Sequence, residues 1–132
     1  MSTKITEKQP PLLFGLVTNT ASEKVFASSG NKKCGDCWMQ GGARLTFRND
    51  GSGQFTFRTR TDKTHSRDTW IQQFDVVDSG GNEVFYSGFF ESYPMHSPDT
   101  VPADYYYEMA KSFKFPKDKF DKIAAVKSIM EC

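Results

Sequence analysis

Hydrophobic and polar residues alternate with a period of two between residues 43 and 61, on both sides of a glycine-rich stretch at residues 49–53. The apolar positions of this segment are Ala43, Leu45, Phe47, Phe55 and Phe57, and most positions between them carry arginine or threonine. Such alternation is typical of strands with one buried face, and glycines allow the positive φ of a tight reversal. The segment therefore predicts a β-hairpin with rings on one face and arginines on the other.

A second hairpin is predicted over residues 69–90, where two segments rich in aromatic and β-branched residues flank a turn that contains two glycines. The two hairpins follow each other along the chain, so we expect their four strands to form a meander. In the last of these strands, alternation places Phe85 and Phe89 on one face and Tyr86 and Phe90 on the other. Because neither face is polar, both are expected to be covered, as in a barrel or a sandwich.

The rest of the chain adds shorter or less regular elements. Residues 12–18 and 24–27 predict two short strands, and alternation across residues 105–115 predicts one long strand. Residues 117–122 are typical of a helical turn after a proline. Residues 123–130 fit a strand or a short helix, and we favour a strand because it would close an otherwise unpaired sheet edge.

Together these elements predict an all-β protein, a single antiparallel β-barrel or flattened sandwich of about seven or eight strands. It is expected to be rich in meanders, with a short helical turn near its C-terminus. A chain of 132 residues suits one domain. Residues 1–11 are polar and end in two prolines, which predicts a flexible N-terminal arm before a single β domain at residues 12–132.

The charge and hydropathy of the chain exclude some classes of partner and indicate a cellular location. With 17 basic and 16 acidic residues, the chain has no strong field for a phosphate backbone, so nucleic acid is not an expected partner. No apolar stretch approaches the ~20 residues that span a bilayer, so no membrane partner is expected. The N-terminus lacks the apolar segment of a secretory signal, which predicts a cytoplasmic protein, or a secreted one if the chain is already processed. A small molecule is the expected partner, and a homodimer stays an open alternative.

Several short motifs resemble those of a family of short, functionally uncharacterised bacterial and fungal proteins. They are Gly35-Asp36-Cys37, the segments at 42–46 and 50–53, Asp68-Thr69-Trp70, Phe120-Asp121-Lys122-Ile123 and the terminal Cys132. The resemblance spans roughly residues 34–132. It implies a β-rich domain in which Cys37 and Cys132 are partners, and it implies no activity. Cys34 and the long N-terminal arm depart from the pattern.

The three cysteines, Cys34, Cys37 and Cys132, leave alternatives open. An odd number cannot form a closed set of disulfides, and free thiols are the ordinary state in a reducing compartment. The disulfide implied by the resemblance is the second alternative. The third is a metal site, which would need Cys132 and either His65 or His96 beside the two closely spaced cysteines. We expect no metal and no other cofactor.

Candidate catalytic residues are His96, Glu108 and Tyr106. His96 titrates near neutrality and lies in a proline-rich loop before the long strand. On that strand Tyr106 and Glu108 share one face. If this face borders a cavity, burial would raise the pKa of Glu108 and Tyr106 would lie beside it as a donor. A pair of this kind could transfer a proton.

Candidate ligand-binding residues are Trp38, Trp70, Tyr86, Tyr93 and Arg58, because rings stack on apolar or sugar ligands and arginine binds carboxylates bidentately. Rings on both strand faces favour a small-ligand-binding barrel with an aromatic-lined cavity. A cofactor-free isomerase or cyclase, acting on a small hydrophobic substrate in that cavity, is the first alternative. A carbohydrate-binding module that uses loop rings is the second.

Overall fold

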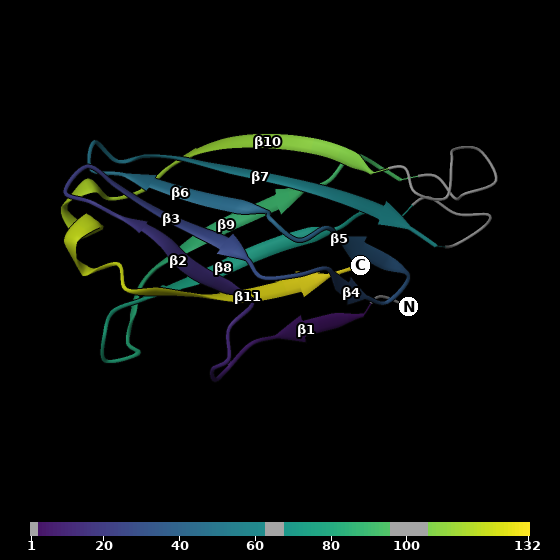
Figure 1. The fold of residues 1–132 in the computed structure, drawn as a ribbon, viewed down its shortest axis with the longest axis horizontal. Coiled ribbons are helices and arrows are strands. Elements are labelled where there is room, and N and C mark those ends of the chain that lie inside the picture. Colours follow the sequence, from purple (N-terminus) through teal and green to yellow (C-terminus); the bar gives the residue numbers. More distant parts are fainter. Residues whose placement is uncertain (1–2, 63–67, 96–105) are drawn as a thin grey trace.

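Two antiparallel sheets face each other and curl into a half-barrel (Figure 1). The computed structural model describes residues 3–62, 68–95 and 106–132. The four-stranded sheet has the order β1 (Lys4–Thr6), β11 (Ala125–Glu131), β8 (Ile71–Val77) and β9 (Glu83–Glu91). The seven-stranded sheet has the order β2 (Phe14–Asn19), β3 (Glu23–Ser28), β6 (Arg44–Arg48), β7 (Ser52–Thr61), β5 (Cys37–Met39) and β4 (Lys32–Cys34), with β10 (Tyr107–Lys114) paired to β7. The predicted all-β fold is confirmed.

The described residues form eleven strands, more than the expected number. The additional strands are short: β1, β4 and β5 have three residues each. A run of three residues is too brief to show a period of two, so the sequence pattern does not reveal such strands.

Both predicted hairpins are present, but they lie in different sheets. β6 and β7 pair within the seven-stranded sheet, whereas β8 and β9 pair within the four-stranded sheet. The expected meander of four strands is therefore divided between the two layers. β7 pairs with β10 along one side, and with β6 and then β5 along the other. Strand β7 is therefore the central neighbour of β5, β6 and β10 in its sheet.

Strand β9 differs from its predicted alternation because its pairing with β8 is irregular. The register shifts between Gln73 and Asp75, and Gly88 adopts a φ of +86°. A bulge inserts residues into one strand and reverses which face the following side chains occupy. Phe85 and Phe90 therefore both pack inward, whereas Phe89 is 68% exposed. The outer face of this sheet is less covered than the sequence predicts.

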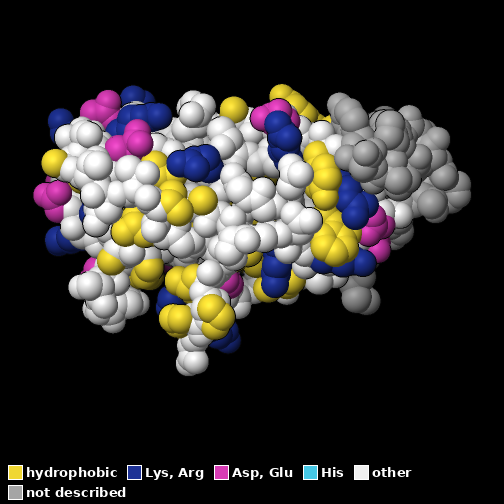
Figure 2. Space-filling model, in the orientation of Figure 1, with side chains coloured by type: hydrophobic (Ala, Val, Ile, Leu, Met, Phe, Trp, Pro, Cys, Tyr) yellow, Lys and Arg dark blue, Asp and Glu magenta, His cyan; other side chains and the backbone are white. Residues whose placement is uncertain are grey.

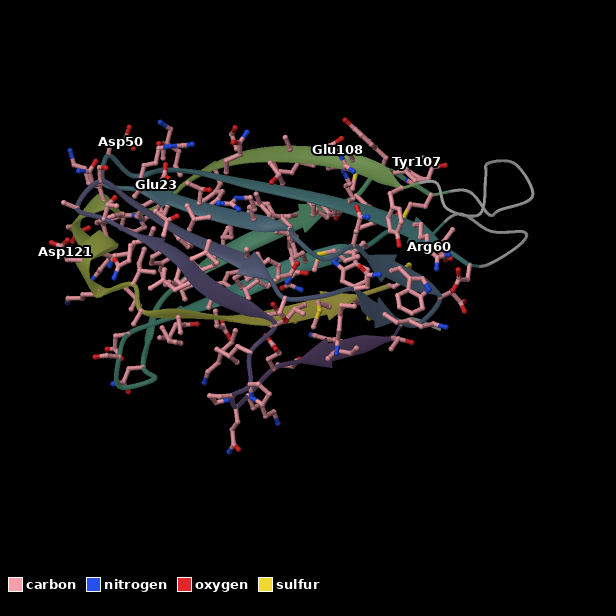
Figure 3. The ribbon with its side chains drawn as sticks, in the orientation of Figure 1. Glu23, Asp50, Arg60, Tyr107, Glu108 and Asp121 are labelled. Carbon is pink, nitrogen blue, oxygen red and sulfur yellow. A yellow bond between two sulfur atoms is a disulfide. The ribbon has the colours of Figure 1, made fainter. Side chains whose placement is uncertain are left out.

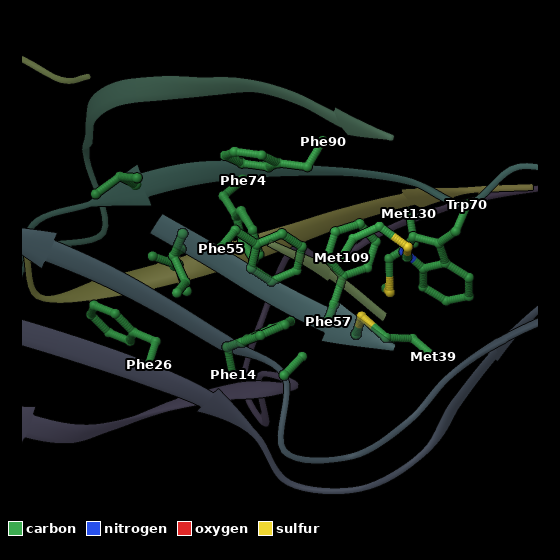
Figure 4. Packing of buried hydrophobic residues seen from close by; sticks show 14 of the residues in the cluster. Phe14, Phe26, Met39, Phe55, Phe57, Trp70, Phe74, Phe90, Met109 and Met130 are labelled. Atoms are coloured by element: carbon green, nitrogen blue, oxygen red, sulfur yellow. The ribbon is translucent and has the colours of Figure 1, made fainter. Parts of the chain in front are cut away.

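The space between the sheets is filled by rings that contact one another (Figure 4). Phe55 from β7 packs within 5.3 Å of Phe74 from β8 and within 5.1 Å of Phe90 from β9, measured between ring centroids. The Phe55–Phe74 contact is edge to face, as are the contacts of Phe47 with Phe26 and Phe85, whereas the Phe90 ring is tilted against Phe55. Edge-to-face packing satisfies the quadrupoles of the rings, so this cluster stabilises the contact between the two sheets.

The chain after β10 confirms two predictions. Residues Lys117–Lys122 form a 3-10 helix, η1, and β11 provides the late strand. Lys24 from β3 is buried at this end of the molecule, and its ammonium group donates hydrogen bonds to the carbonyl oxygens of Phe120 and Ile123, both at 2.9 Å. Burial lowers the pKa of Lys24. Among the described residues, no helix has the length and apolar character that crossing a bilayer requires.

The N-terminal segment, predicted to be a flexible arm, contains β1, which pairs with β11. The carboxylate of Glu7 accepts hydrogen bonds from the backbone N–H groups of Leu13 (2.8 Å) and Ser128 (2.7 Å). Thr3 exchanges two backbone hydrogen bonds with Cys132, so the segment that contains β1 lies beside the C-terminal residue (Figure 1). The polar composition of the N-terminal segment gave no signal for β1, because a strand at a sheet edge tolerates polar side chains.

Cys37 and Cys132 form a disulfide, with 6.1 Å between their Cα atoms. This is the pairing that the family resemblance implies, and it replaces the free thiols expected by default at these two positions. Cys34 is free and buried, although it lies directly opposite Cys37 in the β4–β5 pair. Burial raises the pKa of the Cys34 thiol. The thiol therefore stays protonated at neutral pH.

Gly53 has a specific packing role in β7, because the ring of Phe113 from β10 lies against it. A Cβ atom at Gly53 would lie 2.2 Å from the Cζ atom of Phe113. We expect Gly53→Ala to displace this ring and to lower the free energy of unfolding by about 1–3 kcal/mol, as overpacking does. Urea denaturation measures the change.

Gly15→Ala is the matched control, since Gly15 also lies in a strand and a Cβ there meets no atom within 4 Å. This control should leave stability unchanged or raise it slightly. Combining Gly53→Ala with Phe113→Ala should remove most of the penalty of the added methyl group. Equal losses in the Gly53 and Gly15 variants would contradict the proposed contact.

Candidate functional site

Four of the residues singled out in the sequence gather on the outer face of the seven-stranded sheet. Cross-strand pairing sets Trp38 of β5 opposite Arg60 of β7, and Arg58 opposite Glu108 of β10. Tyr106 directly precedes β10 and reaches Arg60 through its hydroxyl. The neighbouring positions along β5, β7 and β10, such as Met39, Phe57 and Met109, point into the core and are buried. Alternation therefore places the polar members of these strands together outside.

Arg60 lies at the centre of a first group of outer-face side chains, which also contains Trp38, Tyr106 and Asp62. Its Nε–H donates to the Tyr106 hydroxyl at 3.3 Å, and its guanidinium forms an ion pair with Asp62. The guanidinium carbon lies 5.3 Å from the Trp38 ring centroid and 5.8 Å from that of Tyr106. Burial lowers the pKa of Arg60, but the hydrogen bond that Arg60 donates to Tyr106 and the charge of Asp62 outweigh burial and raise it. Arg60 is thus a permanently charged group held between two rings.

Trp38 has a cation on each side. Lys33 of β4 lies 5.3 Å from the ring centroid, and Arg60 approaches from β7 on the opposite side of β5. The indole N–H donates to the Asp62 carboxylate at 2.5 Å. Basic and hydrophobic side chains accordingly alternate over the ends of β5 and β7 (Figure 2). Cations from both neighbouring strands lie against the indole, so sugar stacking on Trp38 would compete with them.

Arg58 and Glu108 form a second group of side chains on the same outer face. Their side chains are ion-paired at 3.2 Å and are 53% and 66% exposed, respectively. Glu108 lies at the same end of the sheet as Arg60 (Figure 3). The sequence hypothesis placed Glu108 beside a cavity that would remove it from water. In the structure it is a solvent-exposed partner of Arg58.

A pocket of about 270 Å³ adjoins this ion pair. It lies where β5 ends and β6 begins, because both strands pair with the same side of β7 and the chain must leave the sheet between them. Gly42 takes a φ of +88° in this connection. The pocket is lined by Gln40, Gly41, Gly42, Ala43, Thr56, Phe57, Arg58 and Glu108.

The other candidate residues lie elsewhere. Trp70 is fully buried in the core, where its indole N–H donates to Gln72 at 3.1 Å. Tyr86 lies on the four-stranded sheet, and burial together with the charge of Asp75 raises its pKa. Tyr93 is 57% exposed, under the ammonium group of Lys111. These rings do not join the outer-face group.

His96, the third predicted catalytic residue, lies outside the described residues. Sequence reasoning also missed the contributions of Gln40, Thr56 and Asp62. Their polar side chains carry no recognisable motif. Only the pairing of β5 and β6 with one strand brings Gln40 and Thr56 to the same pocket.

Comparison with known proteins identifies a family but no relative of known activity. The chain matches no curated protein and no solved structure. One family model matches over residues 44–132, which covers β6 to the C-terminus and includes Arg58 and Glu108. This is more than half of the chain. The protein therefore belongs to the family of unknown function DUF6294.

Proposed function

We propose that the protein binds a small polar ligand with an anionic group in the pocket beside Arg58 and Glu108. The observation that carries this proposal is the pocket itself, which combines a charged pair with amide, hydroxyl and backbone groups. Ligand sites are typically concave and place a few polar groups precisely. At about 270 Å³ the pocket suits a molecule smaller than a typical drug.

The charge of the neighbouring side chains supports an anionic ligand. Arg58 is partly exposed and is held by a single carboxylate, so part of its guanidinium can face a ligand. Arg44, opposite Thr56 on the adjacent strand, adds a second positive charge near the pocket. Guanidinium groups bind carboxylates and phosphates through two parallel hydrogen bonds. Glu108 then positions Arg58 and accepts a donor group of the ligand.

This proposal keeps the small-ligand hypothesis and changes the location of the site. The space between the sheets is filled by phenylalanine rings that pack against one another, and of Trp38, Trp70, Tyr86 and Tyr93, Trp70 alone lies in this core. Phe57 is the one aromatic residue among the described residues that line the pocket on the outer face, and its ring packs on Phe55 in the core. A cytoplasmic location and a family-wide Gly-Asp-Cys motif stay predictions from the sequence.

Native mass spectrometry of freshly purified protein, followed by thermal-shift measurements with a panel of small carboxylates, phosphates and sugars, tests the proposal. We expect a retained or added anion to raise the melting temperature, and Arg58→Ala to weaken its binding about tenfold or more. Arg48→Ala is the matched control, since Arg48 lies on the same hairpin and pairs with Glu23. Equal weakening in both variants, or none in Arg58→Ala, would contradict the site.

The same panel separates the alternatives. Binding of neutral sugars without anions would favour the carbohydrate-binding module. Chemical change of a panel member in the presence of the protein, followed by mass and NMR, would favour the cofactor-free isomerase or cyclase.

A further inference from the structure

Three side chains that could bind a metal ion lie near Cys37, whose side chain is buried on the face of β5 opposite to that of Trp38. One ligand atom each of Cys37, Asp68 and Cys132 lies within 4.8 Å of the other two. The three come from different parts of the chain: β5, a bridge residue before β8, and the C-terminus. Thiolates and carboxylates are ligands that Zn²⁺ prefers in proteins. The fold thus brings together two sulfurs and one carboxylate that the sequence does not place together.

Each of these residues is held by contacts that do not depend on the disulfide. Cys37 pairs with Thr61 in the ladder between β5 and β7. Cys132 exchanges two backbone hydrogen bonds with Thr3, at 2.8 and 3.0 Å. Asp68 exchanges two with Met95, at 3.1 and 2.7 Å. The backbone hydrogen bonds that position the three residues are therefore separate from the sulfur–sulfur bond.

Thr61 orients the carboxylate of Asp68. Its hydroxyl donates a hydrogen bond to the Oδ2 atom of Asp68 and is itself buried. Hydrogen bonds of this kind fix metal-binding carboxylates in other proteins. The hydrogen bond from Thr61 thus holds the Asp68 carboxylate in place beside the two sulfurs.

We propose that the reduced protein binds one Zn²⁺ ion, or another thiophilic divalent cation, through Cys37, Cys132 and Asp68. A dithiol reductant transfers two electrons and two protons to the two sulfurs and becomes a disulfide itself. The ion then displaces the two thiol protons to solvent, and water completes the coordination. Two sulfurs bound to one tetrahedral Zn²⁺ lie about 3.8 Å apart, so each moves by only about 1 Å from its position in a disulfide.

The consequence is that β5 and the C-terminus are tied together in either redox condition. In an oxidising compartment the disulfide joins them. In a reducing compartment the ion takes its place. Cys34 takes no part, because its thiol points toward the carbonyl oxygens of Thr3 and Met130, at 3.4 and 3.7 Å. The site thus differs from a Cys34–Cys37 pair, which the spacing of these residues in the sequence would favour.

Co²⁺ titration tests the proposal, because thiolate ligands give Co²⁺ an intense near-ultraviolet charge-transfer absorption. The full chain is reduced with a phosphine, which becomes its oxide and competes weakly for metal. We expect one Co²⁺ per reduced chain, displaced by one Zn²⁺, and no binding by the oxidised chain. Asp68→Asn should weaken affinity about tenfold or more, and Cys132→Ser should remove most of the absorption. Cys34→Ser is the matched control and should bind like the reduced wild type.

If reduction unfolds the chain, recovery of the strand signal in circular dichroism provides the test instead. In that case Zn²⁺ should restore the strand signal of the reduced wild type and of Cys34→Ser, but not of Cys132→Ser. The proposal is overturned if the reduced wild type neither binds Co²⁺ stoichiometrically nor refolds with Zn²⁺. It is also overturned if Cys34→Ser loses binding while Asp68→Asn retains it.

Discussion

Replacing both Cys37 and Cys132 with serine is expected to lower the free energy of unfolding by about 4–5 kcal/mol. The disulfide joins residues separated by 95 positions, so it closes a loop that contains most of the chain. Breaking it restores the conformational freedom of that loop to the unfolded state, and this entropy grows with loop length. Urea denaturation of the oxidised double variant and wild type measures the difference.

Cys34→Ser provides the control, because it removes the remaining thiol and leaves the disulfide intact. Its effect should be much smaller than that of the double variant. Intact masses with and without reductant should differ by two hydrogens in wild type and in Cys34→Ser. A double variant that loses less than about 1 kcal/mol would show that the Thr3–Cys132 backbone bonds suffice to hold the chain ends.

The hairpins could be predicted because their information is local. In residues 43–61 the alternation of rings and arginines and the glycine-rich turn lie within one short segment, and β6 and β7 follow both signals. The pairing of β10 with β7 is different, because it joins Tyr107–Lys114 to residues 48 to 62 positions earlier. Such a contact depends on which apolar faces fit together in the assembled core, and a single sequence does not encode that choice visibly.

The bulge in β9 shows how one residue changes a prediction. Strict alternation assigns Phe85 and Phe89 to the same face, but Gly88 adopts a positive φ and the register of β9 shifts. Ser87 accepts the backbone N–H of Phe74 at this irregularity. The glycine was the one available signal, since glycine inside a strand often marks a bulge. Continuing the strict alternation through Gly88 assigns Phe89 to a covered face, whereas in the structure its side chain lies on the surface.

For the candidate site, the sequence identified the chemistry better than the location. Trp38, Arg58, Tyr106 and Glu108 were all named, and the register of β5, β7 and β10 brings them to one face. The hypothesis for Tyr106 and Glu108 depended on a cavity that encloses their side of the strand, and in the structure Glu108 is exposed on the outer face of the sheet. The pocket itself depends on β5 and β6 pairing with the same side of β7, which no local pattern reveals.

Phe55→Ala is expected to lower the free energy of unfolding by about 3–5 kcal/mol, the range found for buried phenylalanines. Phe55 is fully buried, and its ring contacts four others at centroid distances of 4.5–6.0 Å. These contacts reach both sheets: the four rings are Phe14, Phe57, Phe74 and Phe90. Truncation would leave a cavity between the layers as well as lose the buried area. Urea denaturation at equal protein concentrations measures the loss.

Phe89→Ala is the matched control, because it removes the same ring from a side chain that is 68% exposed. In a monomer this change should cost well under 1 kcal/mol, since surface substitutions have little effect. The comparison also tests the homodimer left open by the sequence. A loss for Phe89→Ala that rivals that of Phe55→Ala and grows with protein concentration would place Phe89 between two copies, because stabilisation by subunit association rises with the logarithm of concentration. A small, concentration-independent loss would instead show that Phe55 alone of the two rings stabilises the fold.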